Sequence, residues 1–198
     1  MCRACLMTAV IASVALCGAT GEGASAPKTR RTPDSVYVGT PHDVVAKMLE
    51  LVKPTKDDVV YDPGCGDGRI VVMAAKQYGC RAVGIELDPV RVREALANAK
   101  RNGVSDRVKI ERKDIFIVDY REASVVTLYL LPWMNKKLIP QLEKLAPGTR
   151  IVAHDYSIEG ITPDRTMTMT SKEDAVEHYL YVYTAPLKKS AGPKDDER

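Results

Sequence analysis

The sequence predicts an α/β protein with a Rossmann-like, doubly wound sheet that is mostly parallel and ends in an antiparallel strand pair. Three observations support this fold class. Short apolar segments alternate with amphipathic helical segments from residue 57 onward, a glycine-rich turn follows the first apolar segment, and two β-prone runs follow each other near the C-terminus. The 198 residues, 45% hydrophobic and 28% charged, suit one globular domain, and a net charge of +3 is too small to indicate a nucleic-acid partner.

The expected elements follow one another along the chain. Thr40 and Pro41 are residue types that cap and open a helix, and Pro54 ends that helix. Residues 166–184 contain two β-prone runs with no long segment between them, which predicts the antiparallel pair. Between these ends, strands are expected at 59–62, 81–86, 108–112, 125–131 and 150–154, and helices at 68–78, 89–102 and 135–145.

The two ends of the chain differ from its centre in composition. Residues 1–26 contain an uncharged, largely apolar stretch after Arg3, which predicts a signal peptide or a membrane anchor. Residues 27–36 are expected to form a linker, 37–186 the catalytic domain, and 187–198 a charged, disordered tail. The protein is therefore expected to be exported or membrane-associated, with a tether that leaves the domain facing the cytoplasm as the alternative.

The most informative motif is the turn after the first strand. Asp62 ends that strand, and Gly64, Gly66 and Gly68 follow at alternate positions. Glycines lack a Cβ and accept positive φ, so a ligand can lie directly against the backbone. An acid beside the turn would repel a pyrophosphate and attract a cation. The turn therefore predicts a nucleoside ligand with a positively charged tail, and its Gly-x-Gly-x-Gly spacing differs from the Gly-x-Gly-x-x-Gly of NAD-binding folds.

Two further acids follow the next two strands. Glu86 ends the second expected strand, where a carboxylate can accept hydrogen bonds from a ribose diol. Asp114 follows the third, where it can accept from an exocyclic amine. In doubly wound sheets these strand ends meet at the ligand site.

At these residues the chain resembles the class I S-adenosylmethionine-dependent methyltransferases. The resemblance implies that the glycine turn and Asp62 hold the methionine portion of the cofactor, that Glu86 holds the ribose and that Asp114 reaches the adenine. The cofactor residues expected from it are Tyr37, Asp62, Gly64, Gly66, Gly68, Glu86, Leu87, Asp114, Ile115 and Leu130.

A closer resemblance involves segments 37–38, 40–41, 62–71, 113–116, 130–132 and 148–152. They are similar to the family that includes the ATP synthase c-subunit and adenine nucleotide translocase lysine N-methyltransferases and their bacterial relatives. This similarity implies a protein lysine as methyl acceptor. A small molecule or RNA is the alternative acceptor, and a non-catalytic module that only binds S-adenosylmethionine is a further alternative.

Substrate residues are expected after the fourth strand. Tyr129, Pro132 and Trp133 are the candidate catalytic residues, with the two aromatic rings and Tyr37 forming a wall around a lysine. The spacing of Cys65 and Cys80 suits no metal site, and no carboxylate cluster lies near residues 131–133, so no metal is expected. The expected partner is a protein, which can be membrane-associated, and the basic residues within 91–113 alternate with acids, which favours a solvated face over nucleic-acid contact.

Overall fold

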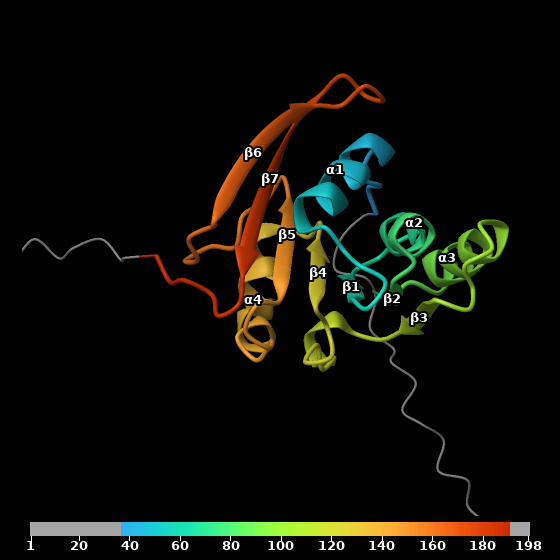
Figure 1. The fold of residues 1–198 in the computed structure, drawn as a ribbon, viewed down its shortest axis with the longest axis horizontal. Coiled ribbons are helices and arrows are strands. Elements are labelled where there is room, and N and C mark those ends of the chain that lie inside the picture. Colours follow the sequence, from blue (N-terminus) through green and yellow to red (C-terminus); the bar gives the residue numbers. More distant parts are fainter. Residues whose placement is uncertain (1–36, 191–198) are drawn as a thin grey trace, which may run out of the picture.

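The computed structural model describes residues 37–190, which form a seven-stranded sheet in the order β3-β2-β1-β4-β5-β7-β6 (Figure 1). Neighbouring strands from β3 to β5 are parallel, and β7 runs antiparallel to both β5 and β6. The predicted fold class is confirmed. The strands are β1 (Val59–Pro63), β2 (Arg81–Glu86), β3 (Val108–Arg112), β4 (Val125–Leu128), β5 (Arg150–His154), β6 (Arg165–Thr170) and β7 (Glu177–Thr184).

Helices cover both faces of the sheet (Figure 1). One apolar cluster buries α1, α2 and α3 against the sheet and contains Val45, Met48 and Val71. A second cluster packs α4 against the opposite face and contains Leu128 and Leu138. Because side chains alternate along a strand, each strand contributes to both clusters. The helices are α1 (His42–Val52), α2 (Arg69–Tyr78), α3 (Pro89–Arg101), the 3₁₀ helix η1 (Ile115–Ile117) and α4 (Pro132–Leu142).

The strand order places a ligand site at the centre of the sheet. β1 lies between β2 and β4, so the order of strands along the chain reverses between β1 and β4. At such a switch point the loops that leave adjacent strands diverge to opposite faces and leave a crevice. Asp62 near the end of β1 and Glu86 at the end of β2 are brought to this crevice by the parallel pairing of the two strands.

The start of α1 differs from the expectation. Pro41 is the N-cap residue and the helix has no side-chain cap, so Thr40 does not cap it. The buried Thr40 hydroxyl instead lies 3.2 Å from Nδ1 of His154 at the end of β5. A long-range contact has replaced the local hydrogen bond that the residue type favours.

The segment between β4 and α4 also differs. β4 ends at Leu128 instead of residue 131, and α4 begins at Pro132 instead of residue 135. Proline lacks a backbone N–H and suits the first helical turn, which explains the early start. Tyr129, Leu130 and Leu131 therefore form a loop between the two elements.

The folded domain extends beyond its expected C-terminal boundary at residue 186. Leu187 packs against the second apolar cluster and Lys189 pairs with Ile161, so residues 187–190 continue the folded domain instead of beginning a disordered tail. The expected signal peptide or anchor (1–26), the linker (27–36) and the rest of the tail (191–198) lie outside the described residues. Within residues 37–190 no helix has the length and apolarity needed to span a membrane.

Candidate active site

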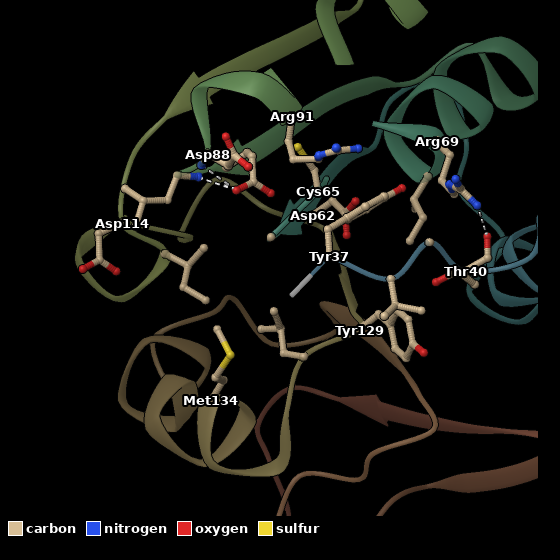
Figure 2. Close-up of a pocket in the computed structure, with 18 residues that line it drawn as sticks. Tyr37, Thr40, Asp62, Cys65, Arg69, Asp88, Arg91, Asp114, Tyr129 and Met134 are labelled. Atoms are coloured by element: carbon tan, nitrogen blue, oxygen red, sulfur yellow. Dashed lines mark hydrogen bonds between the residues drawn. The ribbon is translucent and has the colours of Figure 1, made fainter. Parts of the chain in front are cut away.

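A cavity of about 420 Å³ lies at the carboxyl ends of β1, β2 and β4 and is covered by the segment before α1 (Figure 2). Figure 2 shows Tyr37 and Asp62 near its centre, Asp114 at one end, and Thr40 with Arg69 at the other. Eight of the ten predicted cofactor residues line it: Tyr37, Asp62, Gly64, Glu86, Leu87, Asp114, Ile115 and Leu130.

Asp62 is a buried acid with an incomplete set of hydrogen bonds. Its Oδ1 accepts a 2.7 Å hydrogen bond from the Thr127 hydroxyl, whereas its buried Oδ2 has no partner. Burial, together with the charge of nearby Glu86, raises the pKa of Asp62 to about 7. A buried, unpaired carboxylate is costly, and a cationic group in the cavity would supply the missing partner.

Glu86 is fixed by the backbone around it. Its Oε2 accepts from the Gly66 N–H at 3.0 Å, and its Oε1 accepts from the N–H groups of Leu87 and Asp88 at 2.7 and 2.8 Å. Each carboxylate oxygen has two lone pairs and three of the four are used, so Oε2 of Glu86 can still accept one hydrogen bond from a diol in the cavity. The same contacts join the end of β2 to the glycine turn.

The three glycines of the turn have different roles. Gly64 lines the cavity at φ +76°, and a Cβ there would lie 2.9 Å from Cδ2 of Leu130. Gly66 and Gly68 do not line the cavity. A Cβ on Gly66 would lie 2.0 Å from Cε2 of Tyr37, and one on Gly68 would lie 2.9 Å from Cβ of Ala95 in α3. The first glycine leaves room for a ligand, the second for the Tyr37 ring and the third for helix packing.

Tyr37 and Arg69 join the segment before α1 to the glycine turn. Burial and nearby Asp67 raise the pKa of Tyr37 to about 12, so its hydroxyl stays neutral, and the Arg91 guanidinium lies 4.8 Å from the ring centroid. Arg69 pairs with Asp67 at 2.8 Å and donates a 2.7 Å hydrogen bond to the carbonyl of Thr40. Arg69 thus holds one wall of the cavity in place.

We expect Arg69→Met to weaken cofactor binding about tenfold, because it removes a charge-assisted hydrogen bond that holds residues 39–40 over the cavity. Calorimetry with S-adenosylhomocysteine measures this loss. Arg121→Met is the matched control, since Arg121 pairs with Asp119 two residues earlier in the same way but is exposed. Equal affinity losses in both variants would contradict the role of Arg69.

At the opposite end of the cavity, Asp114 is the N-cap residue of the 3₁₀ helix η1. Its Oδ1 accepts a 2.9 Å hydrogen bond from the Phe116 N–H, and the next residue, Ile115, is buried. An acid beside an apolar side chain suits the edge and face of a nucleobase. Leu130, from the loop after β4, provides a second apolar surface in the cavity.

The three candidate catalytic residues are not equally placed. Tyr129 lines the cavity, and burial, followed by the charge of Asp155, raises its pKa above the ordinary value. Pro132 opens α4 and does not line the cavity. Trp133 is 45% exposed outside it, with its ring centroid 6.0 Å from that of Phe116. Of the expected aromatic wall, only Tyr37 and Tyr129 line the cavity.

Several lining residues were not singled out from the sequence. Met134 lines the cavity, where Trp133 was expected. Because α4 begins at Pro132, both residues lie in its first turn, and of the two only Met134 lines the cavity. Thr40 and Arg91 also line it. The Asp67-Gly68-Arg69 sequence of the turn was the only local signal for Arg69, and none pointed to Met134.

The Tyr129 ring, which lines the cavity, packs against a histidine on its other side. The ring of His154 lies 4.1 Å from that of Tyr129, centroid to centroid, and the side chain is fully buried. Burial lowers the pKa of His154 to about 4, so the ring is neutral at neutral pH. His154 does not line the cavity itself.

Together these features fit S-adenosylmethionine. The unpaired Oδ2 of Asp62 suits the cationic amino-acid tail, Glu86 suits the ribose diol, and Asp114 with Ile115 suits the adenine. Gly64 lines the cavity without a side chain, and any side chain at this position would occupy space beside Leu130. A dinucleotide fits less well, because the Asp62 carboxylate would repel its pyrophosphate.

Comparisons with known proteins support this interpretation. The family described as ANTKMT methyltransferase domain matches residues 62–165. A protein-lysine N-methyltransferase of Saccharolobus islandicus (strain REY15A) is 46% identical over 153 residues, which cover 76% of this chain and 94% of that protein. The adenine nucleotide translocase lysine N-methyltransferase of Mus musculus is 38% identical over 137 residues, covering 67% of this chain but only 59% of that protein.

A solved structure shares both sequence and fold with this chain. It is an RNA methyltransferase from Salinibacter ruber in complex with S-adenosyl-L-homocysteine, and it is 46% identical with a TM-score of 0.69. The match covers 81% of this chain and 100% of that one. The chain is an S-adenosylmethionine-dependent methyltransferase, and it belongs to the family of the ANTKMT methyltransferase domain.

Proposed function

We propose that this enzyme transfers the methyl group of S-adenosylmethionine to the ε-amino group of a lysine in a protein. One observation carries the proposal: the archaeal relative named as a protein-lysine N-methyltransferase is 46% identical and is matched over 94% of its length. Nearly the whole length of that relative therefore has a counterpart in this chain. The mammalian relatives named for the ATP synthase c-subunit and the adenine nucleotide translocase support the same acceptor over about half of their length.

The geometry of the cavity is compatible with this reaction. S-adenosylmethionine supplies an already activated methyl group, so the protein has to position the acceptor amine and remove its charge. A lysine with a pKa near 10.4 in water loses its proton more readily in an apolar pocket. Tyr129, Leu130 and Met134 form a largely apolar wall. Tyr129 stays neutral at neutral pH, so its role is to contact the lysine rather than to act as a base.

RNA is the competing acceptor, because the Salinibacter relative is named as an RNA methyltransferase. The basic stretch of this chain offers little support for it. Arg91 pairs with Glu94 at 2.5 Å, and both Lys109 and Lys113 pair with Glu111. These pairs lower the positive charge that the stretch offers to a phosphate backbone, although Glu111 can neutralise only one of its two lysines. We therefore favour a protein acceptor.

The acceptor can be identified by tracing the methyl group. The purified enzyme is incubated with methyl-labelled S-adenosylmethionine and a heat-inactivated extract, which is then divided into protein, RNA and low-mass fractions. We expect the label in protein, as ε-N-methyllysine after hydrolysis. Glu86→Ala should lose it by removing a residue at the cofactor cavity, and Glu159→Ala, an exposed acid paired with Lys136, should retain it.

Each remaining outcome supports a different function. Label confined to RNA would replace the lysine proposal with the acceptor named for the Salinibacter protein. Label only in the low-mass fraction would indicate a small-molecule acceptor. Cofactor binding with no label in any fraction would indicate a module that binds S-adenosylmethionine without transferring its methyl group.

We also propose that the uncharged segment 4–21 directs the protein to a membrane or out of the cytoplasm. A membrane-tethered domain facing the cytoplasm would keep access to S-adenosylmethionine, which is made there. Cell fractionation with N-terminal sequencing tests this proposal. We expect either a full-length membrane form or an exported form that begins near residue 20, and a full-length form found only in the soluble cytoplasm would contradict it.

A further inference from the structure

Outside the cofactor cavity, three side-chain atoms that could bind a metal ion lie close together, on residues next to Tyr129. They are Nε2 of His154 at the end of β5, Oδ2 of the next residue, Asp155, and Nδ1 of His178 in β7. The two nitrogens are 2.9 Å apart, and each lies 3.3 Å from the carboxylate oxygen. We propose that His154, Asp155 and His178 bind a divalent transition-metal ion of the zinc class. This proposal does not depend on the methyl acceptor.

Two of the three spacings match a metal site, and the third, 2.9 Å between the two nitrogens, would have to lengthen by about 0.4 Å when an ion binds. Zinc binds nitrogen and oxygen ligands at about 2.0–2.1 Å, which places the ligand atoms of a tetrahedral site roughly 3.3 Å from one another. Both histidine rings are buried and Asp155 is partly exposed. Three protein ligands leave a fourth position for water, as in other open zinc sites.

The remaining polar atoms of the ligands have partners of their own. His178 Nε2 lies 3.2 Å from the Asp174 carboxylate, and His154 Nδ1 lies 3.2 Å from the Thr40 hydroxyl. The second oxygen of Asp155 accepts from the Tyr179 N–H at 3.1 Å. A carboxylate behind a ligating histidine fixes its tautomer and strengthens it as a ligand. These outer contacts leave Nε2 of His154, Nδ1 of His178 and Oδ2 of Asp155 within 3.3 Å of one another.

The nature of the ligands selects the class of ion. Two imidazole nitrogens and one carboxylate oxygen suit zinc and its neighbours in the transition series, whereas magnesium and calcium prefer sites made of oxygen. The competing arrangement is a metal-free hydrogen-bond network in which His178 lies between Asp155 and Asp174. In that arrangement a proton would occupy the place of the metal.

The position of the site connects it to the cavity. Thr40 and Tyr129 both line the cavity and both contact His154, one by its hydroxyl and one by its ring. A metal ion would join the end of β5 to the start of β7 behind Tyr129. It would therefore hold the two lining residues in place without contacting the cofactor cavity.

The test uses the full chain without a histidine tag. The protein is stripped with a chelator, loaded with Zn²⁺, desalted and analysed for retained metal, and Co²⁺ loading is followed by visible absorption. We expect one retained zinc that raises the melting temperature, and a tetrahedral Co²⁺ spectrum without thiolate charge-transfer bands. His178→Gln should lose the ion, and Asp174→Asn should bind it about 10- to 100-fold more weakly.

His42→Gln is the matched control, because His42 is the third histidine of the chain and is exposed beside Glu173. It should bind zinc like the wild type. Zinc held by cysteines elsewhere would persist in His178→Gln, and that result would overturn the proposal. So would a folded wild type that retains no zinc, whether or not the variants fold. A loss of stability in Asp174→Asn that is equal with and without zinc would instead support the metal-free network.

Discussion

Replacing Asp62 with asparagine is expected to weaken S-adenosylhomocysteine binding by about two orders of magnitude, because it removes the charge of a buried ion pair. The Oδ2 atom of Asp62 is buried without a partner, while Oδ1 is held by Thr127. Asparagine can keep the Thr127 contact but presents either a neutral oxygen or an amide donor to the cationic tail. Calorimetry of both proteins at one pH above 7 measures the difference.

The pH dependence of binding provides a second measure of the same contact. Because the pKa of Asp62 is about 7 in the free protein, a cation can bind below that pH only if the carboxyl group releases a proton. Affinity should therefore rise by up to about tenfold per pH unit as the pH approaches 7, and then level off. Asp62→Asn should lack this rise. Any pH dependence that remains in the variant comes from other groups, including the ligand, and is subtracted from that of the wild type.

Whereas the cofactor affinity should rise with pH, the free energy of unfolding of the free protein should fall. The pKa of Asp62 is raised from 3.8 by folding, so the wild type should lose stability as the pH rises from about 4 to about 7. Asp62→Asn should not show this loss in chemical denaturation. In Thr127→Val the affinity rise should move to higher pH, because the Thr127 hydrogen bond lowers the pKa. Unchanged affinity in Asp62→Asn would exclude Asp62 from the cofactor site.

The second large effect is expected for Gly66→Ala, which should lower cofactor affinity at least about tenfold. The new Cβ would lie 2.0 Å from Cε2 of Tyr37, so the ring and the segment 37–40 would have to move away from the glycine turn. The positive φ of residue 66 adds a cost of about 1–2 kcal/mol in stability. Calorimetry measures the loss of cofactor affinity, and thermal unfolding measures the loss of stability.

Gly79→Ala is the matched control for this change. Gly79 also has a positive φ, of 69°, but a Cβ there has no neighbour within 4 Å. It should show only the stability loss of about 1–2 kcal/mol that a positive φ causes, with unchanged cofactor affinity. In a Tyr37→Ala background Gly66→Ala should cost less affinity, because the clash is gone. An affinity loss from Gly79→Ala equal to that from Gly66→Ala would refute the role of Tyr37.

The sequence predicted the features that depend on local pattern. Alternating apolar and amphipathic segments identified the parallel sheet, and the acids after the first three strands identified the side of the sheet that carries the cavity. Strands β2, β3 and β5 were predicted at their observed boundaries. Such signals are strong because burial on both faces of a parallel sheet requires continuous apolar strands.

Contacts between distant segments could not be predicted in the same way. Thr40 has the residue type of a helix cap, yet its hydroxyl contacts His154, which is 114 residues away. The pairing of His154 with His178 depends on the antiparallel register of β5 and β7. The early start of α4 brings Met134 rather than Trp133 to the cavity. In each case tertiary packing overrides a local preference.

The cavity beside the glycine turn is the expected binding site of S-adenosylmethionine. A crystal structure of this protein with S-adenosylhomocysteine tests that assignment most directly. We expect the amino-acid tail at Asp62, the ribose at Glu86 and the adenine between Asp114 and Leu130. Ligand density elsewhere, or in this cavity with the amino-acid tail turned away from Asp62, would contradict it.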